Sequence, residues 1–319
     1  MRLLILGGTV FLGRAVVADA LARGHDVTIF HRGTHPAPAG VTELRGDRSI
    51  GDLAALRTGN WDAVVDTSGY VPRIVGDAAA LLAPRVGHYC FISSVSVYAP
   101  QPGPIDETST VATLDDPTVE DLGEGRYGAL KALCETAAAD ATGGRATGVR
   151  AGLIVGPHDP TGRFTYWPHR FARGGEVLVF DRPERTVQLI DVRDLAAWIV
   201  GACEAQVTGP VNVTGTWTMG AVVDACLAAA PAGTEAVWVS DERLVAHDVG
   251  EWMELPLWIA PGSDEAAALT DVRTDRAVAT GLTLRPLAET VEGTLALAAP
   301  VDGVGLVPER ERAVLDAGR

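Results

Sequence analysis

The chain has 319 residues, a formal net charge of −15 at pH 7 and 47% hydrophobic residues. This length suggests roughly two domains, and the apolar content favours a well-filled core over disorder. The negative charge would repel a phosphate backbone, which argues against a general nucleic-acid binder. The sequence contains no uninterrupted apolar run of about 18 residues or more, so no membrane span is expected.

Over the first 150 residues, short apolar runs alternate with stretches of helical periodicity. The apolar runs, which we expect to form buried strands, are residues 2–7, 26–30, 62–66, 88–93 and 146–150. The helical stretches between them are residues 11–24, 51–59, 71–84 and 126–141. This alternation predicts an α/β fold with a Rossmann-type, doubly wound parallel sheet, whose strand carboxyl ends share one functional edge.

Beyond residue 156 the alternation becomes less regular. A strand followed by a helix returns at residues 185–204, a short strand follows at 209–215, and the rest of the chain is mainly helical. We therefore expect a smaller, mostly helical C-terminal lobe that binds the substrate. The predicted dinucleotide-binding domain is residues 1–155, with 185–215 returning to it, and the substrate-binding lobe is residues 156–184 and 216–319.

Several charged and aromatic residues beyond residue 156 could contact a substrate, but packing or surface charge explains each of them at least as well. We assign a catalytic role to none of them: His158, Arg163, Tyr166, Trp167, Arg170, Arg185, Arg193, Trp252 and Trp258.

The cysteines lie far apart in apolar stretches, with no C-x-x-C spacing that would suggest a metal site. We expect buried free thiols at all four positions, which suits a reducing, cytoplasmic compartment: Cys90, Cys134, Cys203 and Cys226. The N-terminal segment MRLLILGG reads as a strand entering a turn and not as a signal peptide.

Glycines stand between the first predicted strand and the first predicted helix, in the segment LILGGTVFLG. In that position, a glycine turn lets the backbone approach a pyrophosphate at a helix N-terminus. The predicted cofactor-binding residues are Gly7, Gly8, Thr9, Phe11, Leu12 and Gly13. Val10 replaces a glycine that such turns usually have, and we expect it to crowd the loop. The alternative is a turn that only packs strand on helix.

The second predicted strand ends in TIFHRG, with His31 and Arg32 where an acid would accept hydrogen bonds from the adenosine ribose of NAD. The nearest acid, Asp26, stands at the start of that strand. A guanidinium offers a permanently charged fork for a 2′-phosphate, so these residues favour NADP over NAD. A solvated surface arginine is the alternative, and NAD remains open as the cofactor.

Lys131 is the only lysine in the chain, and it follows Tyr127 by four residues on a predicted helix. Residues at this spacing share one helix face. A nearby ammonium favours the phenolate form of a tyrosine and lowers its pKa, which is near 10 when unperturbed and too high for efficient proton transfer at neutral pH. A lysine can also act as a compact donor to ribose hydroxyls, which a broad guanidinium cannot. An exposed helical pair without function is the alternative.

Serine hydroxyls occur where the strand FISSVSVY ends, at the predicted functional edge. Ser93, Ser94 and Ser96 could each hold a substrate oxygen there. Turn or capping chemistry is the alternative for any one of them.

Taken together, GGTVFLG, SSVSVY and YGALK resemble the short-chain dehydrogenase/reductase superfamily, in its extended branch of epimerases, dehydratases and reductases. The chain is most similar to an atypical subgroup of that branch, in which a G-G-x-x-x-x-G turn is a usual trait. The resemblance spans most of the chain, and RAGLIVGPHD and IDVRDLA look like later landmarks of the same branch.

The resemblance implies residue roles. Tyr127 matches the general acid/base, and Lys131 matches the partner that tunes the tyrosine and binds the nicotinamide ribose. Ser94 matches the hydroxyl that orients the substrate oxygen, and Asp47 in RGD matches a residue often found beside the adenine. The resemblance also implies a homodimer formed through the helix that carries Tyr127.

The departures from the family pattern concern the substrate. Ala151 and Leu153 stand where many nucleotide-sugar enzymes have proline and asparagine, which leans towards another substrate. We therefore expect an NADP-dependent oxidoreductase acting on a small carbonyl or alcohol. A nucleotide-sugar epimerase or dehydratase that recycles NAD is the first alternative, and a non-enzymatic NAD(P)-sensing or RNA-binding relative is the second. Tyr70 in DTSGYVP either covers the nicotinamide pocket or only packs.

Overall fold

The chain divides into two compact units in a computed structural model that describes residues 1–101, 103–123, 125–180, 182–262 and 271–317. Unit 1 consists of Met1–Gly152, Val192–Thr214 and Val272–Thr283. Unit 2 consists of Leu153–Asp191, Gly215–Asp271 and Leu284–Arg319.

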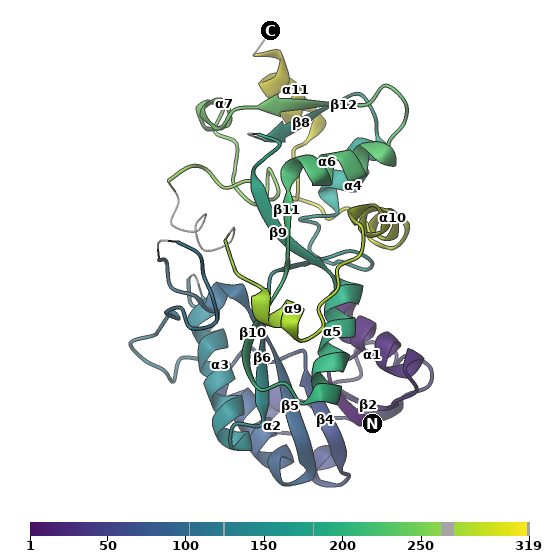
Figure 1. Ribbon diagram of the computed structural model, residues 1–319, viewed down its shortest axis with the longest axis vertical. Helices are drawn as coiled ribbons and strands as arrows, with labels where there is room; N and C mark the ends of the chain where they lie inside the picture. Colours follow the sequence, from purple (N-terminus) through teal and green to yellow (C-terminus); the bar gives the residue numbers. More distant parts are fainter. Residues whose placement is uncertain (102, 124, 181, 263–270, 318–319) are drawn as a thin grey trace. The chain divides into compact units, whose positions relative to one another are not determined.

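Unit 1 contains a seven-stranded parallel sheet, drawn in the lower part of Figure 1. Its order is β10-β6-β5-β4-β1-β2-β3, so the direction of winding reverses between β1 and β4. The strands are β1 (Arg2–Leu6), β2 (Asp26–His31), β3 (Thr42–Arg45), β4 (Trp61–Asp66), β5 (Val86–Ser94), β6 (Ala146–Ala151) and β10 (Gly209–Val213). This arrangement confirms the predicted Rossmann-type fold.

Helices cover both faces of this sheet (Figure 1). On one face α1 (Phe11–Ala22) packs beside α5 (Val192–Ala205), and on the other α2 (Pro72–Leu82) packs beside α3 (Tyr127–Thr142). Strand residues and residues of α2 and α3 form one apolar cluster, which includes Leu4, Phe91, Val75, Leu82 and Ala138. The near-continuous apolar strands are required because helices bury the sheet on both sides.

The short helical segments of unit 1 follow strands or join helices. They are η1 (Arg48–Ile50), η2 (Ala54–Arg57), η3 (Ala83–Arg85), η4 (Val95–Val97) and α9 (Asp275–Ala279). We expected a helix over residues 51–59, but only the four residues of η2 are helical there. Gly51 and Gly59 have positive φ of 75° and 97°, so the backbone leaves the helical region on both sides of that turn.

The unit boundaries differ from the expected ones. Unit 1 ends at residue 152 rather than 155, and it resumes at residue 192 rather than 185. Residues 186–191 form β9, which pairs with strands of unit 2 and not with the large sheet. Residues 272–283, which we expected in the lobe, join unit 1, where the Arg276 Nη1 donates to the Pro210 carbonyl of β10 at 2.6 Å.

Unit 2 combines two small sheets with five helices among its described residues. The strands are β7 (Leu153–Val155), β8 (Glu176–Phe180), β9 (Thr186–Asp191), β11 (Gly215–Thr218) and β12 (Glu235–Val239). The helices are α4 (Tyr166–Ala172), α6 (Met219–Ala228), α7 (Asp241–Ala246), α10 (Leu287–Leu297) and α11 (Pro308–Asp316). The strands β7, β8, β11 and β12 were not predicted, and residues 263–270 of the expected helical stretch lie outside the described residues.

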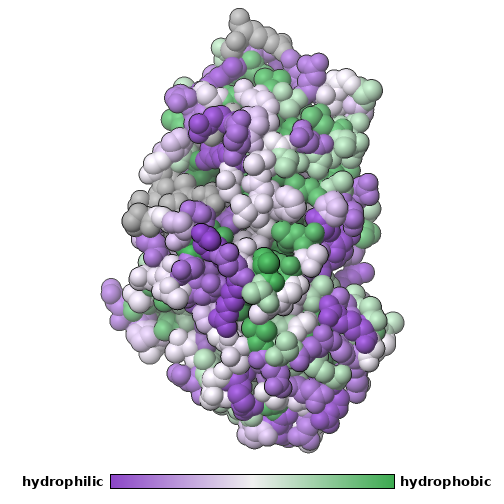
Figure 2. Space-filling model, in the orientation of Figure 1, coloured by the Kyte–Doolittle hydropathy of each residue, from purple (hydrophilic) through white to green (hydrophobic). Residues whose placement is uncertain are grey.

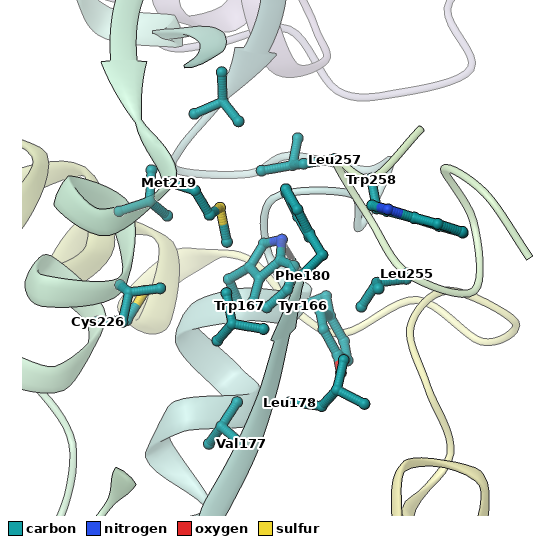
Figure 3. Packing of buried hydrophobic residues seen from close by; sticks show 14 of the residues in the cluster. Tyr166, Trp167, Val177, Leu178, Phe180, Met219, Cys226, Leu255, Leu257 and Trp258 are labelled. Carbon is teal, nitrogen blue, oxygen red and sulfur yellow. The ribbon is translucent and has the colours of Figure 1, made fainter. Parts of the chain in front are cut away.

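The core of unit 2 is aromatic. Figure 3 shows Trp167 beside Tyr166 and Phe180, and the ring centroids of Trp167 and Phe180 are 5.8 Å apart at 67°. Met219 and Trp258 belong to the same buried cluster. Such edge-to-face contacts favour dense packing of large rings. Tyr166 and Trp167, which we had considered as substrate contacts, are therefore core residues of this unit.

Hydrophilic residues are interspersed with small apolar patches over the face shown in Figure 2. The four cysteines are buried free thiols, as predicted. Within the described ranges, the helices are too short or too polar to cross a membrane, and no three His, Cys, Asp or Glu side chains gather in a way that could hold a metal ion.

Candidate active site

The glycine turn joins the carboxyl end of β1 to α1 within unit 1. Gly7 and Gly8 have φ of 113° and 95°, a conformation that side-chain-bearing residues rarely adopt. A Cβ on Gly13 would lie 2.7 Å from the Gly8 nitrogen, and a Cβ on Gly7 would lie 2.4 Å from Thr67 Oγ1. Only glycine allows this close approach of strand, turn and helix.

The start of α1 is open to an anion. Its N-cap residue, Val10, makes no side-chain capping hydrogen bond, so the N-cap itself does not satisfy the first amides of the helix. The Val10 side chain is 48% exposed and so does not fill the space between strand and helix. Phe11 has a positive φ of 37°, whereas Leu12 is buried and packs into the core. The residues of this turn, with their missing Cβ atoms, fit the close approach of a dinucleotide pyrophosphate.

An acidic residue of the neighbouring strand lies beside the end of β2, where the sequence suggested none. The buried His31 ring is 2.9 Å from Glu43 Oε1 on the neighbouring strand β3, and Arg45 Nε donates to the same oxygen at 2.8 Å. This acid was not considered from the sequence, because it stands 12 residues after His31. Arg32 is exposed beside this group.

Asp47 lies at the N-cap of η1, next to the end of β3. Its Oδ1 accepts hydrogen bonds from the Ser49 nitrogen at 2.9 Å and from Ser49 Oγ at 2.6 Å. These hydrogen bonds lower the pKa of Asp47, and the charge of Arg32 adds to the effect. Asp47 therefore stays ionised near the Arg32 guanidinium.

The serines at the end of β5 have different environments. Ser93 is buried, Ser94 is half-buried and Ser96 is exposed. Ser94 Oγ accepts from the Ser96 nitrogen at 3.1 Å and so caps η4. Below this serine turn, Tyr98 donates from its hydroxyl to Asn212 Oδ1 at 2.6 Å and accepts from Arg150 Nη1 at 2.9 Å, which ties the turn to the sheet.

Helix α3 begins at Tyr127, directly against the serine turn. A Cβ on Gly128 would lie only 1.9 Å from the Ser96 carbonyl oxygen. Gly128 is thus the residue that allows the first turn of the helix to reach the serines. The Tyr127 side chain is 39% exposed.

Lys131 lies one turn further along α3 and is buried, with 4% of its surface exposed. Its Nζ donates to the Gly69 carbonyl at 2.8 Å and to the Ile92 carbonyl at 2.6 Å. These carbonyls follow β4 and belong to β5, respectively. The ammonium is therefore held at the carboxyl edge of the sheet by the backbone of two neighbouring strands and their turns.

Tyr70 lies beside both members of the tyrosine–lysine pair. Its ring centroid is 6.5 Å from that of Tyr127 and 4.9 Å from Lys131 Nζ. The ammonium also lies 4.5 Å from the Phe91 ring centroid. Aromatic faces attract a cation, so these rings favour the charged form in an otherwise apolar environment.

Burial lowers the pKa of Lys131 from 10.5 to about 8. We expect this side chain to titrate with a midpoint near pH 8. The folded state releases the proton at a lower pH than the unfolded state, so stability should rise as the pH increases from about 8 to 10.5. Because the chain has one lysine, incorporation of ¹³Cε-lysine gives one side-chain NMR signal whose pH dependence measures this value. A midpoint near 10.5 would contradict the buried position.

Several residues of this site were missed from the sequence. Arg48 and Asp66 form a buried ion pair next to the turn that binds Lys131. The sequence did contain a signal for Asp66, because this carboxylate directly follows the apolar residues AVV of a predicted buried strand. Gly69 and Gly128 gave no signal of their own, because their role depends on backbone atoms that are distant in the sequence.

The match to a known protein family spans parts of both units. Residues 74–214, somewhat less than half of the chain, match the model of the NAD dependent epimerase/dehydratase family. This segment is similar to that family. The matched residues include Ser94, Tyr127 and Lys131, whereas the glycine turn precedes them. The match agrees with the resemblance to the epimerase/dehydratase branch of the short-chain dehydrogenases/reductases.

Solved structures share the fold over nearly the whole chain. A UDP-glucose 4-epimerase of Thermotoga maritima, in a structure with UDP-glucose, is 17% identical, with 93% of this chain and 99% of that chain covered and a TM-score of 0.65. The human epimerase family protein SDR39U1, in a structure with NADPH, is 22% identical, with 93% and 100% covered and a TM-score of 0.61. WbmG of Bordetella bronchiseptica, in complex with NAD, is 20% identical, with 93% of each chain covered and a TM-score of 0.66.

A curated relative matches over a shorter range. The chloroplast stem-loop binding protein of 41 kDa b of Arabidopsis thaliana is 29% identical over 114 residues. The match spans 30% of this chain and 30% of that protein, so it describes only part of either.

Proposed function

We propose that the chain is an NAD(P)-dependent oxidoreductase, with a preference for NADPH, that acts on a small carbonyl or alcohol. The observation that carries this proposal is the buried Lys131 ammonium at the carboxyl edge of the sheet, one helical turn from Tyr127 and beside the Ser94 turn. All three residues lie in the unit that contains the glycine turn. The family of residues 74–214 supports nicotinamide chemistry.

The roles follow from the positions. A bound nicotinamide would exchange hydride with the substrate carbon. Tyr127 exchanges a proton with the substrate oxygen, because it combines an exposed phenol with a cation one turn away. Ser94 donates a hydrogen bond to that oxygen, and Lys131 favours the phenolate by its charge. The backbone at Gly7, Gly8 and Gly13 would hold the pyrophosphate.

The preference for NADPH rests on the charges at the ends of β2 and β3. Glu43 contacts the end of β2 through His31, but its carboxylate is already paired with His31 and Arg45. Arg32 is exposed, and Arg45 Nη1 would lie 3.4 Å from a Cβ on Gly33, so two guanidinium groups border this strand end. Arg45 is paired with Glu43, so the Arg32 guanidinium is the charge that would favour a 2′-phosphate over a hydroxyl.

We expect Arg32→Ala to weaken NADPH binding about tenfold or more and to leave NADH binding nearly unchanged, because a lost charge-assisted contact costs about 1.5–3 kcal/mol. Titration calorimetry with both cofactors measures this difference. Arg57→Ala, at an exposed arginine of η2, is the control and should change neither affinity. Equal losses for NADPH and NADH in Arg32→Ala would contradict the assignment.

The test of the whole proposal is cofactor binding followed by turnover. The purified protein should bind NADPH reversibly and oxidise it when small aldehydes and ketones are added. An epimerase or dehydratase uses the same residues but recycles its cofactor, so mass spectrometry of the purified protein would then find tightly retained NAD. The absence of binding by any nicotinamide dinucleotide would overturn the proposal.

A non-enzymatic binder is the second candidate, because the Arabidopsis relative is named for binding a stem-loop. The net charge of −15 opposes binding to a polyanion. Retention of a labelled RNA stem-loop at about 150 mM salt would favour this candidate, since nonspecific electrostatic binding weakens as salt increases. We expect no retention under these conditions.

A further inference from the structure

A buried ion pair joins η1, the short helical segment after β3, to the carboxyl end of β4. Arg48 Nη1 donates to Asp66 Oδ2 at 2.7 Å, and Nη2 donates to Asp66 Oδ1 at 2.8 Å. Asp66 is 0% exposed and Arg48 is 9% exposed. Two parallel hydrogen bonds fix the orientation of the guanidinium as well as its distance. Arg48 follows Asp47 on η1, and Asp66 is the last residue of β4.

Both oxygens of the carboxylate have further donors. The Tyr89 hydroxyl donates to Asp66 Oδ2 at 2.8 Å, and the Ser68 nitrogen donates to Oδ1 at 3.1 Å. Arg48 Nη2 also donates to Ser68 Oγ at 2.8 Å. These contacts satisfy the buried carboxylate and lower its pKa against the opposing effect of burial. They also hold the turn that begins at Asp66.

This turn leads directly to Lys131. Gly69, three residues after Asp66, supplies one carbonyl acceptor, and Ile92, three residues after Tyr89 on β5, supplies the other. A Cβ on Gly69 would lie 3.2 Å from Asp66 Oδ2, so the turn packs closely on the carboxylate. Both acceptors of the ammonium are therefore attached to backbone that the Asp66 hydrogen bonds restrain.

Well-packed apolar residues can replace a buried ion pair without loss of stability, so stability alone does not explain why a protein has one. We infer that Arg48 and Asp66 are positioning residues, which hold Lys131 at the site and link its turn to the segment that carries Asp47. This inference rests on the proposed function and adds to it a route from the adenine end of the site to the lysine. It assigns no direct contact with a substrate to either residue.

The pKa of Lys131 depends on the charges and the burial around its ammonium, so a measured pKa reports whether the turn from Asp66 to Gly69 keeps its position. Cys134, Asp66 and Glu135 raise its pKa, whereas Arg48 and, above all, burial lower it. Arg48 and Asp66 act in opposite directions, so their joint removal leaves burial as the main cause. A loosened turn would admit water and let the pKa rise towards 10.5.

The experiment uses the full chain labelled with ¹³Cε-lysine, which gives the single Lys131 signal. Two variants test the network. Arg48→Met/Asp66→Leu removes both charges, and Tyr89→Phe removes one hydrogen bond without a change of charge. Arg73→Met is the control, because Arg73 lies on the surface of α2 and pairs with Glu120. Thermal unfolding shows which variants fold, and NADPH affinity is measured for each.

We expect the Lys131 midpoint to rise by about one pH unit in the double variant and about half a unit in Tyr89→Phe, and to stay near the wild-type value in Arg73→Met. NADPH binding should weaken several-fold in the double variant. A folded double variant with the wild-type Lys131 midpoint would overturn the inference. If the double variant does not fold, a wild-type midpoint in Tyr89→Phe would overturn the inference instead. Failure of the wild-type protein to bind any nicotinamide dinucleotide would instead overturn the proposed function, whatever the titration of Lys131.

Discussion

Replacement of Tyr127 by phenylalanine should reduce turnover by about 10²–10⁴-fold, the usual contribution of a general acid or base. The substitution removes one oxygen from a side chain that is 39% exposed at the first residue of α3. The helix, its close contact at Gly128 and the Lys131 hydrogen bonds do not depend on that oxygen. Binding of NADPH should therefore remain close to the wild-type value.

The measurement is NADPH oxidation with the most active small carbonyl found for the wild-type protein, together with calorimetric binding of NADPH. Tyr70→Phe is the matched control, since Tyr70 lies 6.5 Å from Tyr127 between ring centroids and loses the same atom. We expect this control to keep most of its activity. Full turnover in Tyr127→Phe would reject the assigned proton transfer.

Glu311→Gln should destabilise unit 2 by roughly 3–5 kcal/mol, because it leaves a buried guanidinium without its counter-charge. Glu311 Oε2 lies 2.7 Å from Arg170 Nε, and Oε1 accepts from the Leu178 nitrogen at 3.0 Å. Glu311 is 4% exposed and Arg170 is 8% exposed. Through these contacts the carboxylate of α11 holds α4 and β8 together. Arg170, once considered a substrate contact, therefore has a structural partner.

Urea unfolding followed by tryptophan fluorescence measures this loss, since Trp167, Trp217, Trp238, Trp252 and Trp258 all lie in unit 2. Glu309→Gln makes the same substitution at an exposed position of α11 and should change stability by less than about 0.5 kcal/mol. Similar unfolding midpoints for the two variants would show that the buried pair contributes little.

The strands that were predicted correctly are the five interior strands of the large sheet, its edge strand β10, and β9 of unit 2. The interior strands β1, β2, β4, β5 and β6 are buried over almost their whole length, because helices cover the sheet on both sides. β3 was missed because it lies at the edge of the sheet, where its residues TELR are largely exposed and show no apolar run. β8 had an apolar run, EVLVF, that should have been assigned.

The candidate site shows the same division. The glycine turn and the spacing of Tyr127 and Lys131 could be predicted because each is formed by residues that are close together in the sequence. Glu43, Arg48 and Asp66 were not assigned, because their partners lie 12 or 18 residues away and meet only when the strands pair. No local pattern records such a pairing.

The amino-acid sequence by itself determined the strand–helix alternation, the glycine turn and the tyrosine–lysine spacing, since short-range sterics and burial restrict these to few residue types. Tertiary structure alone decided that Lys131 is buried between two backbone carbonyls, that Arg48 pairs with Asp66, and that residues 272–283 return to unit 1. These features depend on which distant segments lie together in the folded chain, because burial and hydrogen bonding act through space.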